Sequence, residues 1–369
     1  SEVRADDLAA IVLKEIVKRN PQIPAEEIED VILGCANQAG EDNRNVARMA
    51  SLLAELPIKI GGETVNRLCA SGMAAIANAY RAIAIGEGDF YIAGGVEQMT
   101  RAPYVLSKSA QPFGRDVQLF DSSFGWRFVN PKMKELYGVD GMGETAENLA
   151  EIYKISREAQ DEFALLSQQK ATSAQNSGRL AQEIVNVEIP QKKGEPKIFS
   201  QDEFVKPDTT LDKLAKLRPA FKKEGGSVTA GNSSGLNDGA AAMILASEDA
   251  VKKYNLKPLA KIISSAVVGV EPRIMGIGPV EATKKALSRA NLSLEDMDII
   301  ELNEAFAAQA LSVLQELGID ANDERLNPNG GAIALGHPLG MSGTRIVGTA
   351  ALELQKKNKK YALCTLCIG

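Results

Sequence analysis

The run Val65-Asn66-Arg67-Leu68-Cys69-Ala70-Ser71-Gly72-Met73-Ala74-Ala75 places a cysteine where small residues open an alanine-rich segment. This pattern predicts a helix that begins close to Cys69. A thiol at such a position meets unpaired backbone N–H groups and the positive end of the helix dipole, and both favour the thiolate. Because the thiolate is the nucleophilic form of cysteine, we interpret Cys69 as a nucleophile. The alternative is a small buried apolar residue with no chemical role.

Two further candidate residues stand beside glycines near the end of the chain. His337, the single histidine, lies in Gly336-His337-Pro338-Leu339-Gly340, and Cys367 lies in Leu366-Cys367-Ile368-Gly369. Glycines allow a backbone to pass close to a ligand, so a purely structural role suits this histidine poorly. Two thiols and one imidazole predict covalent catalysis with proton transfer.

Two more segments have the character of ligand sites. Residues 297–302 read as a strand that runs into Asn303, and the carboxyl ends of strands carry ligand sites in α/β sheets. Asn303 can equally be the N-cap of the helix that follows, and the two roles are compatible. The small and polar run 228–239, VTAGNSSGLNDG, is either a long turn before a strand or a loop that approaches a cofactor.

The composition bounds the class of protein. The chain has 369 residues, 44% of them apolar and 24% charged, with a net charge of −6, which predicts globular domains and argues against a nucleic-acid partner. Four cysteines suit a reducing cytoplasm, and one histidine with a lone Cys-x-x-Cys pair predicts no metal site. No apolar run approaches the ~20 residues that span a bilayer, and no secretory signal is visible, so we expect a cytoplasmic protein with no membrane partner.

Helices that alternate with short apolar strands predict a layered α/β fold. Residues 69–97 and 337–369 share one plan of turn, helix, break and buried strand, which indicates an internal duplication. Strands are expected at 31–33, 89–93, 241–246, 260–270, 297–302 and 361–367. The region between the halves carries two predicted helices, at 146–153 and from a Ser156 cap to about 173. The lysines at 192–223 form either a solvated face or a lid for a phosphorylated ligand.

Five motifs, occurring in this order, together resemble the thiolase family. They are Asn66-Arg67-Leu68-Cys69-Ala70-Ser71-Gly72, the run 231–240 (GNSSGLNDGA), Asn303-Glu304-Ala305-Phe306, Gly336-His337-Pro338-Leu339-Gly340 and Cys367-Ile368-Gly369. The resemblance covers essentially the whole chain. It implies a five-layer αβαβα fold from two similar halves, residues 1–98 plus 237–257 and residues 258–369, with an inserted loop domain at 99–236 that acts as a coenzyme A lid.

The resemblance also implies acyl transfer between coenzyme A thioesters. Cys69 would carry the acyl group, His337 would take its proton, and Cys367 would be the general acid in cleavage and the base in condensation. One oxyanion site would use His337 with a water held by Asn303, and the other the N–H groups of Cys69 and Gly369. Coenzyme A would be a cosubstrate, with no prosthetic group, and would contact Ser234, Ala230, Phe221, Met142 and Lys206.

For the substrate, Phe306 would line the pocket, and the segments 119–131 and 361–367 look closest to thiolases that cleave 3-oxoadipyl-CoA in aromatic-acid degradation. Arg127 would then bind the distal carboxylate, or it forms a structural ion pair. Alternatives are a biosynthetic acetoacetyl-CoA thiolase, although Gly141 stands where such members often have histidine, a non-catalytic homologue, and a ketoacyl synthase. The family norm is a homodimer or homotetramer. Family members usually have one more strand at each end, and we expect both to be missing from this chain.

Overall fold

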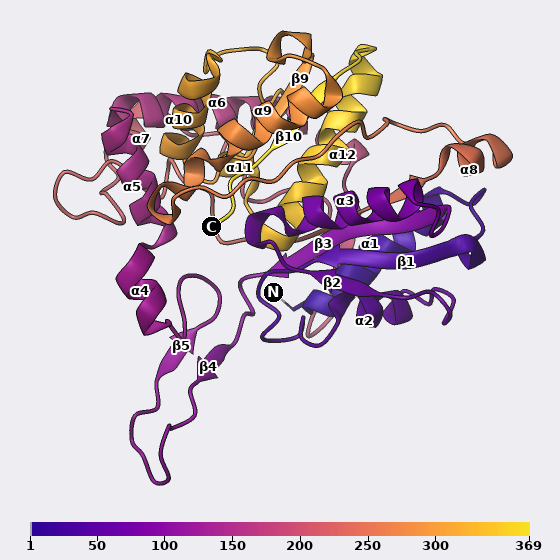
Figure 1. Ribbon diagram of the computed structural model, residues 1–369, viewed down its shortest axis with the longest axis horizontal. Helices are drawn as coiled ribbons and strands as arrows, with labels where there is room; N and C mark the ends of the chain where they lie inside the picture. Colours follow the sequence, from indigo (N-terminus) through magenta and orange to yellow (C-terminus); the bar gives the residue numbers. More distant parts are fainter. Residues whose placement is uncertain (1) are drawn as a thin grey trace.

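The computed structural model describes residues 2–369, so Ser1, the first residue of the expected N-terminal half, lies outside the described residues. The N-terminal half is built on a four-stranded sheet, shown in Figure 1, with the order β2-β1-β3-β8. Its strands are β1 (Ile28–Gly34), β2 (Glu63–Val65), β3 (Phe90–Gln98) and β8 (Asp238–Ala246). β1 runs parallel to β2 and β3, whereas β8 returns from far along the chain and pairs antiparallel with β3.

Helices cover both faces of this sheet because its strands alternate their side chains between two apolar clusters. Val31 and Leu33 pack with α1 (Ala5–Arg19) and α2 (Val46–Leu53). Ile32 packs on the opposite face with α3 (Ser71–Ala84). All nine residues of β3 are buried, as expected for a central strand with a helix layer on each side.

The C-terminal half has a parallel pair, β9 (Ile299–Leu302) and β10 (Ala362–Thr365). Ile300 and Leu302 pack with α9 (Gly278–Ala290) and α10 (Ala307–Leu317), while Ile299 packs with α12 (Leu339–Lys357) on the other face. Since α3 and α12 also contact β3, these two helices form the middle layer between the sheets. The layers follow the expected αβαβα order (Figure 1).

The middle helices cross at glycines from the motifs that the sequence singled out. A Cβ placed on Gly343 would lie 2.4 Å from the main-chain nitrogen of Met73, and one on Gly340 would lie 2.4 Å from the carbonyl oxygen of Val96. Only glycine permits such close approach of two backbones. The glycines around His337 therefore seat α12 against α3 and β3.

Residues 99–237 form the excursion between β3 and β8 and correspond to the segment proposed as a loop domain. Its hairpin, β4 (Tyr104–Leu106) with β5 (Leu119–Asp121), projects from the body in Figure 1. The two predicted helices are confirmed as α5 (Met142–Ile152) and α6 (Arg157–Asn176), and the Ser156 hydroxyl caps α6 by accepting from the N–H of Ala159 at 3.1 Å. The excursion also contains α4 (Pro131–Tyr137), η3 (Leu180–Gln182), β6 (Val187–Ile189), β7 (Lys197–Phe199) and α7 (Leu211–Ala215).

Short elements complete the chain: η1 (Ala25–Glu27), η2 (Leu68–Ala70), α8 (Glu248–Lys253), η4 (Pro272–Ile277), η5 (Leu294–Asp296) and α11 (Ala332–Leu335). The strand expected at 260–270 is wrong. That segment is half-buried or exposed, and no strand within residues 2–369 pairs with it, so it has no ladder to join. Across the same residues, no helix is both long and apolar enough to cross a bilayer.

Candidate active site

Cys69 lies in η2, immediately before α3, as the sequence predicted. The hydroxyl of Ser71 fixes this turn because it accepts from the N–H of Arg67 at 2.8 Å and donates to the carbonyl of Leu68 at 2.7 Å. Leu68 adopts a φ of 45°, in the left-handed region, so the turn before the thiol is strained.

Burial raises the pKa of the Cys69 thiol, and this effect exceeds the opposing influence of the N–H groups of Gly369 and of Cys69 itself. The N–H groups therefore favour the thiolate, as the sequence predicted, but they do not decide the direction of the overall shift. The N–H groups are correctly placed, but desolvation of the charged form outweighs them. The thiol therefore holds its proton more tightly than an exposed cysteine does.

His337 is buried just before α12, and its contacts define its tautomer. Its Nδ1 lies 2.6 Å from the hydroxyl of Ser342, which donates its own proton to the carbonyl of Pro338 at 3.0 Å. The hydroxyl oxygen must then accept from Nδ1–H, which leaves the lone pair on Nε2. Burial, followed by the charge of Arg345, lowers the pKa of His337 to about 4, so the imidazole is neutral and can accept a proton.

Asn303 is buried at the carboxyl end of β9. Its Nδ2 lies 3.4 Å from Nε2 of His337, and its main-chain N–H donates to the carbonyl of Thr365. Its interpretation as a helix N-cap is wrong, because α10 begins at Ala307 with Phe306 as the N-cap. The Asn303 Oδ1 is buried and has no hydrogen-bond partner within the described residues, so the amide is free to hold a further polar group.

Cys367 follows β10 and is 1% exposed. Burial raises the pKa of its thiol, and the nearby Cys69 raises it further, so the two sulfurs lie close enough to interact electrostatically. Cys367 packs in a cluster with Phe306 and Met142. The last residue of this motif, Gly369, has its Cα against Met142, whose sulfur lies 2.4 Å from the position of an added Cβ.

Three residues expected to contact coenzyme A lie along one path that leads to this centre. The Phe221 ring meets Phe306 edge-on, with centroids 6.0 Å apart, and also packs against Gly143 in the first turn of α5. Met142, the residue before, contacts Gly369. Ser234 lies in the loop before β8, and its hydroxyl donates to the carbonyl of Ala305 at 3.1 Å. Ala230 is exposed in this loop.

Two further residues that were expected to contact a ligand are Lys206 and Arg127. Lys206 has its ammonium 5.0 Å from the centroid of the Phe204 ring and lines a cavity of about 570 Å³ beside α6. Phe204 packs against Gly235, which connects Lys206 to the Ser234 loop. Arg127 donates to the main-chain carbonyls of Ser122 and Asn37, at 3.3 and 3.5 Å. Its guanidinium therefore holds two loops together and has no carboxylate partner within the described residues.

Sequence reasoning missed three residues that hold this centre in place. Ser342 orients the imidazole, the Asn237 side chain accepts from the N–H of His337 at 3.2 Å, and Glu97 accepts from the N–H of Gly340 at 2.8 Å. Asn237 stood within the polar run that was singled out. Glu97 is a charged residue near the end of β3, whose earlier residues are apolar, and this is a usable signal for a buried functional group. Ser342 had no such signal beyond lying one turn after the histidine.

Two buried thiols thus lie near each other, the N–H of Gly369 lies near the Cys69 sulfur, and a neutral imidazole lies beside Asn303. Residues 1–249 match the family described as thiolase, N-terminal domain, and residues 256–369 match thiolase, C-terminal domain. The 3-oxoadipyl-CoA/3-oxo-5,6-dehydrosuberyl-CoA thiolase of Escherichia coli K12 is 59% identical over 369 residues, which cover 100% of this chain and 92% of that protein. A beta-ketoadipyl-CoA thiolase of Acinetobacter baylyi is 58% identical, over 100% and 91%. The crystal structure of the Bacillus anthracis acetyl-CoA acetyltransferase superimposes with a TM-score of 0.91 at 42% identity, over 100% and 90%.

Proposed function

This chain belongs to the thiolase family, and we propose that it cleaves 3-oxoadipyl-CoA with coenzyme A to give acetyl-CoA and a shortened acyl-CoA. The observation that carries the proposal is full-length similarity, at 59% identity, to a relative named for that substrate. The resemblance of segments 119–131 and 361–367 to this branch of the family supports the same choice.

The roles that we propose for the four central residues are those that the resemblance to the thiolase family implies. Nε2 of His337 takes the Cys69 proton, and the sulfur attacks the 3-keto carbon. Breaking the carbon–carbon bond leaves an acyl group on Cys69 and the acetyl-CoA enolate, which Cys367 protonates. A second coenzyme A then accepts the acyl group.

Developing negative charge needs donors that are already in place. We assign one oxyanion site to His337 with a water held by Asn303, and the other to the N–H groups of Cys69 and Gly369. The unpartnered Oδ1 of Asn303 supports the first assignment, since a water there would satisfy it. The effect of the Gly369 N–H on the Cys69 thiol supports the second.

For coenzyme A we propose contacts with Phe221, Met142, Ser234, Ala230 and Lys206, with Phe306 lining the acyl pocket. Coenzyme A is a cosubstrate here, and no prosthetic group is required by these roles. The contacts of Arg127 favour a role in fixing the loop at Ser122 over carboxylate binding.

We further propose a cytoplasmic homodimer or homotetramer. Large apolar side chains are exposed along and beside the β4–β5 hairpin, namely Tyr104, Leu106, Phe113, Leu119, Trp126 and Phe128. Exposed large apolar side chains that gather in one region are a feature of protein–protein contacts.

The decisive experiment compares coenzyme A-dependent cleavage of 3-oxoadipyl-CoA and acetoacetyl-CoA, with Cys69→Ser as the inactive control. A strong preference for 3-oxoadipyl-CoA is expected. Preference for acetoacetyl-CoA would instead support the acetoacetyl-CoA thiolase alternative. The similarity to the acetyl-CoA acetyltransferase is the observation that favours this alternative. Cleavage by the Cys69→Ser protein at the wild-type rate would contradict the thiolase mechanism itself.

A further inference from the structure

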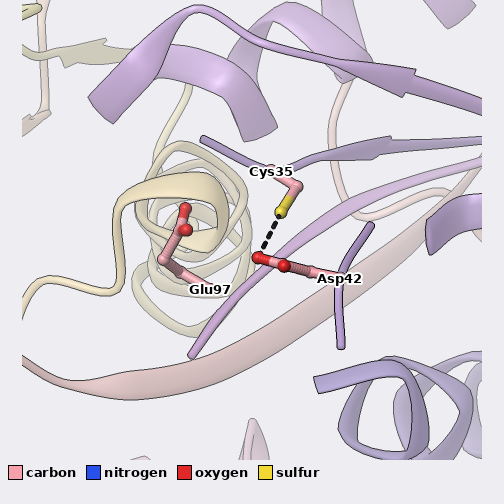
Figure 2. Close-up of side chains that lie close together, drawn as sticks. All are labelled: Cys35, Asp42 and Glu97. Carbon is pink, nitrogen blue, oxygen red and sulfur yellow. Dashed lines mark hydrogen bonds between the residues drawn. The ribbon is translucent and has the colours of Figure 1, made fainter. Parts of the chain in front are cut away.

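A buried group of three side chains lies beside the site and has no part in the proposed chemistry. Figure 2 shows the side chains of Cys35, Asp42 and Glu97 close together. The sulfur and one carboxylate oxygen from each acid lie within 4.8 Å of one another. Glu97, at the end of β3, is 1% exposed. Burial of a carboxylate is costly unless it is hydrogen-bonded, so its partners reveal what it does.

The partners show that this group binds main chain, since each of its four carboxylate oxygens accepts at least one hydrogen bond from an N–H group. The Glu97 carboxylate accepts from the N–H groups of Ala36 at 2.9 Å, Asn37 at 3.0 Å and Gly340 at 2.8 Å. The Asp42 carboxylate accepts from the N–H groups of Gln38 and Gly40 and from the thiol of Cys35. A metal ion at these oxygens would face the positive ends of the N–H donors.

One branch of the Glu97 contacts reaches the histidine. Gly340 is the second residue of the 19-residue helix α12, whose N-cap, Pro338, offers no side-chain hydrogen bond. Glu97 therefore supplies an acceptor for an N–H that the helix leaves unpaired, and its charge lies at the positive helix end. This fixes the turn that contains His337.

The other branch reaches the nucleophile. The carbonyl of Ala36 accepts from Nδ2 of Asn66 at 3.0 Å, and Oδ1 of Asn66 accepts from the N–H of Leu68 at 2.9 Å. Leu68 directly precedes Cys69. Glu97 is thus connected by hydrogen bonds to both catalytic loops, which are more than 260 residues apart in the chain.

We propose that Glu97 is a positioning residue that sets the separation of Cys69 and His337 by accepting main-chain N–H groups from the segments that carry each of them. The proposal rests on the catalytic roles given above. Burial is the main cause of the raised pKa of Cys69, and the Glu97 charge raises it further. Removal of this charge should therefore lower the pKa of Cys69. The titratable groups that face Glu97 are Asp42 and Cys35, and burial raises the Glu97 pKa to about 6.

The test replaces Glu97 by glutamine, which turns one acceptor oxygen into a donor that faces main-chain N–H groups. The kcat of Glu97→Gln should fall by about 100-fold with the KM for acyl-CoA little changed, since displacement of the reacting groups by ~1 Å has effects of this size. Two readouts need no substrate: the pH midpoint of Cys69 alkylation by iodoacetamide should move down, and the NMR signal of the single histidine should shift.

Asp42→Asn is the matched control, because Asp42 is buried in the same group but does not contact Gly340. It should leave the His337 signal and kcat near wild type. Asn66→Ala breaks only the Cys69 branch at an exposed residue, so it should lower kcat without moving the His337 signal, and it keeps the proposal testable if Glu97→Gln does not fold. Wild-type kcat in Glu97→Gln, or equal losses in Asp42→Asn, would overturn the proposal. Because alkylation and NMR report on the site directly, a wrong substrate assignment would leave these two results unchanged.

Discussion

The Nδ1 of His337 lies 2.6 Å from the hydroxyl oxygen of Ser342, one turn into α12. Because that hydroxyl gives its proton to the carbonyl of Pro338, the contact fixes the imidazole as the Nδ1–H tautomer. The basic Nε2 then faces Asn303. A helix turn, rather than a carboxylate, thus orients the proposed base and leaves it neutral.

Replacing Ser342 by alanine should therefore slow catalysis. The Nδ1–H would lose its buried acceptor, which costs about 1–2 kcal/mol and corresponds to a decrease in kcat/KM of about tenfold. Steady-state kinetics checks this value. Thr344→Val is the matched control on the same helix, since the Thr344 hydroxyl has no hydrogen-bond partner within the described residues, and it should retain near wild-type kcat/KM. Equal kinetics in both variants would remove Ser342 from the site.

The pH dependence of stability should carry the signature of His337. Its folded pKa of about 4 lies below the ordinary value of 6.5, so the unfolded chain binds more protons between these values. The contribution of the neutral imidazole is complete above pH 6.5 and is lost as pH falls toward 4, by ~3 kcal/mol. Urea titrations at pH 7 and 5 should show a smaller loss on acidification in His337→Asn than in wild type. An NMR midpoint for the single histidine near its ordinary value would contradict this.

The sequence predicted the central strands and the α5 and α6 helices well, because these depend on local periodicity, capping and glycine placement. The unpaired segment 260–270 shows the limit, since an apolar run becomes a strand only when a neighbour supplies a ladder. The pKa of Cys69 shows another. The helix start is visible in the sequence, but the burial that outweighs it results from the packing of Leu366 and Ile368 around the thiol.

The same limit applies to the partners of the motif residues. Glu97 and Gly340 are 243 positions apart, and nothing in the local sequence of either one indicates their contact. The sequence left two interpretations of Arg127 open, a substrate carboxylate or a structural ion pair, whereas its guanidinium donates to two backbone carbonyls. Long-range contacts of this kind follow from the topology that brings β3, α12 and the loop together.

Phe221→Ala should weaken binding of coenzyme A more than it slows the reaction. The ring is 39% exposed and is held by its edge-on contact with Phe306, so it offers a free face to a ligand. Loss of an aromatic contact costs about 0.5–1.5 kcal/mol beyond its buried area, which predicts a rise in KM for coenzyme A of about threefold to tenfold at similar kcat. The exposed Phe113, between strands β4 and β5, provides the control, and Phe113→Ala should leave this KM unchanged.

Substitution of Cys367 should separate the two halves of the reaction. Acyl transfer between coenzyme A and Cys69 needs the nucleophile and His337, but it makes or breaks no carbon–carbon bond and so requires no proton at carbon. Cys367→Ala should therefore lose thiolytic cleavage by at least about 100-fold, the lower range for loss of a general acid. It should still exchange labelled coenzyme A into acetyl-CoA.

Cys69→Ala should lose both activities, because no acyl-enzyme can form. Iodoacetamide should still alkylate Cys69 in the Cys367→Ala protein, because this substitution leaves the Cys69 thiol in place. If Cys367→Ala abolished exchange while Cys69 remained alkylatable, Cys367 would have to act in acylation, and the division of roles between the two thiols would be wrong.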